Sequence, residues 1–231
     1  MKHSTATRHH PFASGVSRFS LRSAIAISML ATALSPATYA AGIEDSILEL
    51  QHDWEAIRYQ SPPAEREKRF EVLVAKAHKV SSSFAGRSEP LVWEGIIVSS
   101  WAGEKGGIGG LGLAKQAKAL YEAAIQIDGN VLDGSAYNSL GVLYYKVPGW
   151  PLGFGDKVKA KELLQKALAI NPQSIDANYF YGEFLVETKQ PDDAVSYLER
   201  SLQAPDRPGR QVSDTGRRDE ARALLEKVRA R

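Results

Sequence analysis

The residues that could act as acids or bases in this chain stand apart from any nucleophile. Glu183 and Glu187 lie one helical turn apart, where two carboxylates could share a proton. Beyond residue 40 the only histidines are His52 and His78, and the chain has no cysteine, so neither a catalytic triad nor a histidine–cysteine metal cluster is expected. Such a glutamate pair is more often a solvated helix face. We therefore expect no enzyme, no cofactor and no metal; a hydrolase or transferase acting through Glu183 is the minority alternative.

A glycine-rich segment, residues 107–112, satisfies the spacing of a dinucleotide-binding loop. That chemistry requires a strand before the first glycine, whereas here a helix is expected. We therefore interpret Gly107 and Gly109 as part of a long loop, residues 102–112, whose backbone packs closely on a neighbour. The alternative is that free N–H groups leading into a helix at Leu113 hold a carboxylate or a phosphate.

A second long loop, residues 146–156, carries two aromatic residues. Trp150 lies between Gly149 and Pro151, and Phe154 follows. Rings placed in this way could form a lid over a ligand or an anchor for a partner. The alternative is that both rings fold back over the seam between two helices, because burying one ring is worth about 2–3 kcal/mol.

The elements that must position these loops are helices. Apolar residues at helical spacing predict amphipathic helices over residues 43–57 and 64–80, and Ser61-Pro62-Pro63 separates them. Further along, two glycines each precede a set of small and apolar residues in which the second and third members follow the first by four and seven positions: Gly141 with Ala160, Leu164 and Ala167, and Gly182 with Ala194, Leu198 and Ser201. Small residues allow two helices to approach closely, while the leucines fill the seam between them.

This spacing predicts helical hairpins at residues 90–130, 134–172 and 175–205. A capping helix is expected at 213–231, because one of its faces is apolar and the other is highly charged. In the first two hairpins the extra length falls in the turn between the two helices. Equivalent turns emerge on the same edge of a stack, so we expect the two long loops to lie side by side.

These features resemble the tetratricopeptide repeat (TPR) family, whose helix–turn–helix unit repeats every 34 residues or so. Tyr137, Leu140-Gly141 and Tyr144 come close to the family pattern, while Glu94 stands where the family has leucine. The resemblance implies an all-α, right-handed solenoid whose inner face is lined by the first helix of each repeat. The register then places these residues on the inner face: Val92, Ile96, Ser99, Asn138, Val142, Tyr145, Tyr179, Glu183 and Val186.

Such a face is a semi-polar groove with aromatic walls, which suits an extended peptide or an amphipathic helix. It lacks the lysine and asparagine clamp by which chaperone-binding relatives hold a C-terminal carboxylate. An alternative is that the protein's own N-terminal helix fills the groove. We therefore predict a non-enzymatic scaffold that binds a protein or peptide partner. The alternative function is a ligand-binding or accessory component of a periplasmic solute transporter, with its site under the two loops.

A looser resemblance concerns the loops. The glycine segment, residues 147–151 and residues 204–210 are similar to the periplasmic T component of tripartite ATP-independent (TRAP) transporters. This resemblance implies a transporter or a solute-binding protein as a partner. Members of that group are lipid-anchored, and this chain has no cysteine to carry the anchor.

The first 40 residues have the composition of a secretory signal peptide. A basic segment without acidic residues precedes an apolar run, residues 24–34, that is too short to span a bilayer, and a cleavage site is expected after Ala40 or Ala41. The alternative is an uncleaved interfacial anchor. Cleavage removes four of the 29 basic and none of the 27 acidic residues, which leaves a net charge of −2. We therefore expect a soluble periplasmic protein, residues 41–231, without an integral membrane segment and without a nucleic-acid partner.

Overall fold

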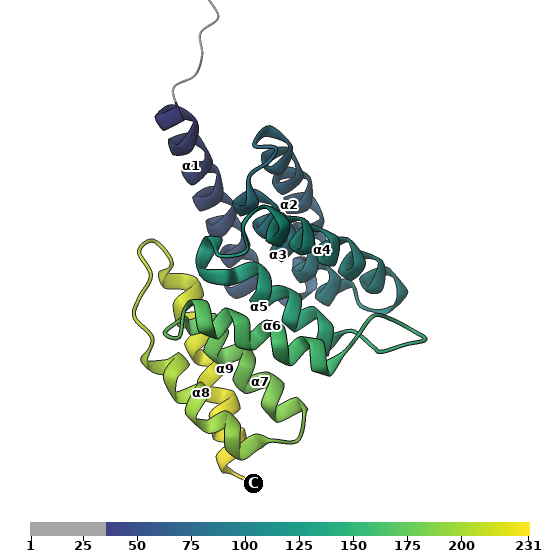
Figure 1. Ribbon diagram of the computed structural model, residues 1–231, viewed down its shortest axis with the longest axis vertical. Helices are drawn as coiled ribbons and strands as arrows, with labels where there is room; N and C mark the ends of the chain where they lie inside the picture. Colours follow the sequence, from purple (N-terminus) through teal and green to yellow (C-terminus); the bar gives the residue numbers. More distant parts are fainter. Residues whose placement is uncertain (1–35) are drawn as a thin grey trace, which may run out of the picture. The chain divides into compact units, whose positions relative to one another are not determined.

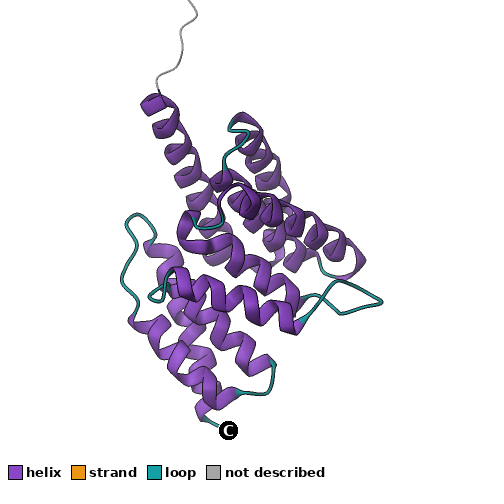
Figure 2. Ribbon diagram, viewed as in Figure 1, coloured by secondary structure: helices purple, strands orange, loops and turns teal. Residues whose placement is uncertain are grey.

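The computed structural model describes residues 36–231, and their side chains from residue 42 onward. The predicted signal peptide lies, up to residue 35, outside the described residues. Within the described part the chain is helical and has no β-strand (Figure 2), so the predicted all-α class is confirmed. The elements are α1 (Pro36–Glu55), the π-helix η1 (Ala56–Gln60), α2 (Pro63–Ser83), α3 (Ser88–Lys105), α4 (Gly107–Asp128), α5 (Val131–Lys146), α6 (Lys157–Ile170), α7 (Ile175–Glu187), α8 (Pro191–Gln203) and α9 (Gln211–Arg229).

The helices from α3 to α8 pack as three hairpins of the TPR type: α3 with α4, α5 with α6, and α7 with α8 (Figure 1). The glycines allow this close packing. A Cβ atom at Gly141 would lie 2.8 Å from Leu164 Cγ, and one at Gly182 would lie 2.9 Å from Leu198 Cδ2. Both leucines are fully buried. The predicted role of the glycines and of the leucines that fill the seam is therefore confirmed.

Two helix starts follow from polar side chains at their N-termini. The Asp156 carboxylate accepts hydrogen bonds from the N–H groups of Val158 and Lys159 at the start of α6. The Ser174 hydroxyl accepts one from the N–H of Ala177 at the start of α7. These side chains satisfy backbone donors that have no partner inside the helix, and so fix where each helix begins.

The predicted glycine loop is wrong. Helix α3 continues to Lys105 and α4 begins at Gly107, so Gly106 alone separates them and Gly109 is helical. Close packing overrides the low helix propensity of glycine here: a Cβ atom at Gly110 would lie 2.6 Å from the Ala102 carbonyl oxygen. The extra length of this hairpin therefore lies in longer helices, and the expectation of two long loops side by side is wrong as well.

Glu94, which departs from the family pattern, contacts two polar side chains of α2. The Glu94 side chain is buried, and its carboxylate accepts a hydrogen bond from the Ser81 hydroxyl. His78 Nδ1 lies 3.0 Å from the other carboxylate oxygen. A glutamate at this position therefore ties α2 to α3, where leucine would offer packing alone.

The N-terminal and C-terminal helical segments of the described chain are in contact. Helix α9 packs on α7 and α8 and also contacts η1, which follows directly after α1. A Cβ atom at Gly216 of α9 would overlap the ring of Tyr59 in η1, so glycine permits this approach. None of the helices in residues 36–231 is long and apolar enough to cross a membrane.

Candidate functional site

The inner face of the hairpins borders a cavity of about 1290 Å³. The first helix of each hairpin contributes residues three or four positions apart, which is the spacing of one helix face. These helices are α3, α5 and α7, and α3 contacts α5 as α5 contacts α7. Their lining residues include Ile96, Ser99, Ser100, Ser135, Asn138, Ser139, Val142, Tyr179, Phe180 and Glu183.

Most of the residues that the sequence places on the inner face lie at this cavity. Ile96, Ser99, Asn138, Val142, Tyr179 and Glu183 line it. The other three do not line the cavity. Val92 of α3 is fully buried, and Tyr145 and Val186 belong to the core between the hairpins. The prediction that Tyr145 faces the groove is therefore wrong. Its side chain points into the core, where its ring centre lies 5.6 Å from that of Phe184.

Glu183 is held by three side chains. The Tyr145 hydroxyl donates to one carboxylate oxygen at 2.6 Å, and the Tyr179 hydroxyl lies 3.4 Å from the other. Lys146 Nζ lies 3.1 Å from Glu183 and also pairs with Glu187. Burial alone would lower the pKa of Lys146, but the two carboxylates outweigh it and raise that pKa. The two glutamates therefore share a lysine cation.

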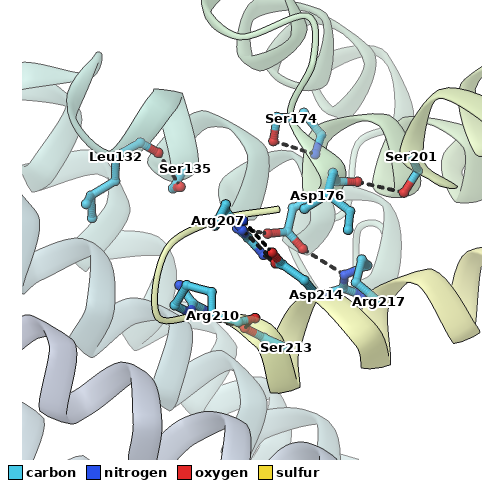
Figure 3. A network of polar contacts seen from close by, with 12 residues as sticks. Leu132, Ser135, Ser174, Asp176, Ser201, Arg207, Arg210, Ser213, Asp214 and Arg217 are labelled. Atoms are coloured by element: carbon cyan, nitrogen blue, oxygen red, sulfur yellow. Dashed lines mark hydrogen bonds and ion pairs between the residues drawn. The ribbon is translucent and has the colours of Figure 1, made fainter. Parts of the chain in front are cut away.

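The opposite wall comes from the two ends of the chain. Tyr59 and Arg58 of η1, the segment before α9 and α9 itself line the cavity. Figure 3 shows Arg207 between two aspartates: its Nε and Nη2 atoms donate to Asp214, and its Nη1 atom donates to Asp176 at 2.8 Å. The sequence analysis did not place Arg207 at the site, because the register of the hairpins ends before residues 204–210. Two arginines in this short segment, Arg207 and Arg210, were the available signal.

Asp176 joins α7 to both parts of this wall. It accepts hydrogen bonds from Arg207 and, at 2.7 Å, from Nε of Arg217 in α9. Burial acts to raise the pKa of Asp176, but the two guanidinium groups outweigh it, so this pKa lies well below its usual range. The carboxylate therefore stays charged and keeps the arginines in place.

Arg210 differs from the neighbouring arginines. Its Nε atom donates to the Ser213 hydroxyl at 3.1 Å and lies 3.6 Å from the Glu55 carboxylate (Figure 3 shows Arg210 beside Ser213). Its guanidinium carbon lies 5.1 Å from the ring centre of Trp93. Glu55 in turn accepts hydrogen bonds from the N–H and the hydroxyl of Ser213, at 3.3 and 2.9 Å. A buried carboxylate from α1 is thus bound to the start of α9.

The N-terminal helices therefore form a wall of the cavity and do not fill it. Arg58 Nη2 of η1 donates to Glu220 of α9 at 2.8 Å, which adds a second polar contact between the ends. Trp54 and Tyr59 line the cavity from this side, and their rings meet edge to face with centres 5.8 Å apart.

Several polar atoms at the cavity have no partner among the described residues. They are Asn138 Oδ1, Trp93 Nε1 and the Tyr59 hydroxyl oxygen. Trp93 and Asn138 are about nine-tenths buried or more. Buried polar atoms are nearly always hydrogen-bonded in proteins, so these three atoms are exceptions in the wall of the cavity.

The two aromatic residues of the loop at residues 146–156 lie in different surroundings. Trp150 is 90% exposed and is not among the residues that line the cavity. Phe154 folds back, and its ring meets that of Tyr144 at 5.5 Å between centres. Pro148 and Leu152 of the loop line the cavity, as does Gly107 at the start of α4, whereas Gly109 does not. Among the described side chains, those of residues 42–231, no three histidine or acidic residues come close enough to hold a metal ion.

Comparisons with known proteins give a family match for part of the chain. Residues 152–209 match the family model of the tetratricopeptide repeat. Among solved structures, the chain is similar to the crystal structure of MamA, with 21% sequence identity and a TM-score of 0.42 over 71% of this chain and 90% of that chain. Comparison with curated proteins gives no match. The segment that contains α6, α7 and α8 is thus similar in sequence, as well as in its hairpin packing, to the tetratricopeptide repeat family.

Proposed function

We propose that this protein is a non-enzymatic scaffold that binds an extended segment of a protein partner at the inner face of its hairpins. The observation that carries the proposal is the cavity itself, whose wall is built from the first helices of all three hairpins. Its volume, about 1290 Å³, exceeds the range of roughly 300–1,000 Å³ that is usual for small-ligand pockets.

The chemistry of the α5 wall suits a peptide backbone. The Asn138 side-chain amide makes no hydrogen bond to any described residue, although it is 6% exposed. A side-chain amide offers both a donor and an acceptor, as a peptide group does. Val142 lies one helical turn away and Ile96 lines the same cavity from α3, so apolar side chains of the segment have partners beside it.

The absence of catalysis is part of the proposal. Glu183 is a carboxylate at the inner face that could act as a base, and Lys146, Tyr145 and Tyr179 already engage it. These contacts take up most of its acceptor positions, which leaves little room for a substrate proton.

Export to the periplasm is proposed on the sequence of residues 1–40, with its basic segment, apolar run and small residues before the expected cleavage site. Fusing these residues to alkaline phosphatase, which is active only after export, tests this point: activity is expected, and its absence would contradict export.

Site-specific photo-cross-linking tests the binding face. A photoreactive residue at Val142, at the cavity, is expected to capture a defined partner in cells, whereas one at Lys161, exposed on the outer helix α6, captures it at background level. Asn138→Ala is expected to lower the yield at Val142 several-fold with the helical content unchanged. Equal capture at both positions, or a yield that Asn138→Ala leaves intact, would contradict the proposal.

A second candidate is a ligand-binding accessory component of a solute transporter. The contact between η1 and α9 favours it, because this contact bounds the cavity on the side where an open groove would continue. Capture of a transporter subunit or a solute-binding protein at Val142 would identify this role, and a partner of another class would exclude it.

A further inference from the structure

We propose that Arg210 is the anion-binding residue of a small-ligand site in this cavity, where an amphipathic organic acid places its carboxylate on the guanidinium group and its apolar body against Ile96 and Leu132. The inference goes beyond the proposed protein partner, since it concerns a small molecule at the wall that the chain ends build.

The first observation is that the Arg210 guanidinium group uses only part of its hydrogen-bonding capacity. Its Nε atom is engaged by Ser213, but its two terminal nitrogens make no hydrogen bond to any residue from 36 to 231. Arg207, three residues earlier, uses Nε and both terminal nitrogens on Asp214 and Asp176. A guanidinium edge with two parallel free N–H donors matches the two oxygens of a carboxylate.

The surroundings leave this charge under-compensated. Arg210 is 9% exposed, and its nearest carboxylate, Glu55, lies 3.6 Å away while accepting two hydrogen bonds from Ser213. Burial and then repulsion from Arg207 lower the pKa of Arg210, although Asp176, Glu55 and Asp214 oppose that shift. A bound anion would supply the compensation that the protein provides only in part.

A second observation comes from atoms that do not belong to Arg210. The indole N–H of Trp93, whose ring lies under the Arg210 guanidinium, has no partner, and neither has the hydroxyl of Tyr59. Both residues line the same cavity, and Trp93 is 5% exposed. Both groups can donate a hydrogen bond, and either would gain a partner if an oxygen atom of a bound acid came within hydrogen-bonding distance.

The rest of the wall selects the kind of acid. Ile96, Leu132 and Tyr59 are partly buried and pack on the core cluster that contains Trp93, and all of them face the cavity. Such a surface favours an apolar body over a hydrated one. A doubly charged phosphate would meet the nearby carboxylates of Glu55 and Asp176, whereas a single carboxylate needs one guanidinium edge.

Pairs of ligands that differ from octanoate in one part only, the carboxylate or the apolar chain, test the proposal on the wild-type protein. Titration calorimetry is expected to show binding of octanoate. Octanol, which lacks the carboxylate, and acetate, which lacks the body, are each expected to bind at least tenfold more weakly. Inorganic phosphate is expected to give no heat of binding. Octanol that binds as tightly as octanoate, or phosphate that binds as tightly, would overturn the assignment.

Variants then test the residue. Arg210→Lys keeps the positive charge and removes the two-donor edge, so octanoate is expected to bind at least fivefold more weakly. Arg222→Lys is the matched control, because Arg222 lies in α9, is not among the residues that line the cavity, and has a side chain that is 55% exposed. This variant is expected to bind octanoate as the wild type does. Unchanged binding by Arg210→Lys would overturn the proposal.

The ligand pairs remain decisive if Arg210→Lys fails to fold, as circular dichroism would show. These titrations contain no protein partner. Loss of cross-linking at Val142 would therefore contradict the scaffold function alone, and loss of octanoate binding would contradict the acid site alone.

Discussion

Replacing Asp176 by asparagine tests the polar network that joins α7 to the end of the chain. The aspartate accepts hydrogen bonds from Arg207 and Arg217, and its side chain is 29% exposed. Removing one partner of a fully buried ion pair costs about 3–5 kcal/mol. Because Asp176 is partly exposed and asparagine keeps one acceptor oxygen, we expect a loss of about 2–3 kcal/mol in the free energy of unfolding. For a chain of this length that corresponds to a fall of roughly 5–10 °C in Tm.

The pH dependence gives this prediction a second readout. The pKa of Asp176 is depressed in the folded protein, so its contribution is present above the pKa of the unfolded state, about 3.9 for aspartate, and is lost as the pH falls below that value. Urea unfolding followed by circular dichroism is the assay. The difference between wild type and Asp176→Asn is expected to be constant from pH 5 to 7 and to shrink below pH 4.

The matched control is Asp206→Asn. Asp206 also pairs with an arginine, at 2.7 Å, but its side chain is 79% exposed, so its replacement is expected to change the unfolding free energy by less than about 0.5 kcal/mol. Equal effects of the two variants at pH 7, or a difference for Asp176→Asn that persists undiminished at pH 3, would refute the reasoning.

Other substitutions test the packing. Gly182→Val is expected to lower the unfolding free energy in urea by about 2–3 kcal/mol, because the new Cβ atom would lie 2.9 Å from Leu198, and a neutral outcome would contradict the close helix contact. Gly112→Ala, in α4 with nothing within 4 Å of the new atom, is expected to raise it by about 0.5–1 kcal/mol; a decrease would mean that the site is crowded. Trp150→Ala is expected to leave Tm within about 2 °C, since the ring is 90% exposed, and a large fall would show that it packs.

The hairpins could be predicted because local spacing determines them. Leu164 and Leu198, which contact Gly141 and Gly182, each follow an alanine by four residues and precede another small residue by three, and this pattern is visible in the sequence. The inner-face residues Asn138, Val142 and Tyr179 follow from the same register. The prediction of a loop at residues 107–112 was wrong, because the low helix propensity of glycine favours a loop there while packing against α3 holds the segment helical.

The second wall could not be predicted in the same way. Glu55 and Ser213 are separated by most of the described chain, and no spacing rule relates residues so far apart. Whether the first and last helices meet depends on small rotations that add up over successive hairpins. Arg210 therefore acquires its surroundings, Glu55 and Trp93, only once the whole stack is assembled.

The most direct test of the closed cavity is the interaction energy between the two ends of the described chain. The Ser213 hydroxyl donates to the buried Glu55 carboxylate at 2.9 Å. A double-mutant cycle with Glu55→Gln and Ser213→Ala, measured by urea unfolding, is expected to give a coupling energy of about 1–2 kcal/mol. A coupling energy of zero would show that the end of α1 and the start of α9 do not meet, and the cavity would then be an open groove.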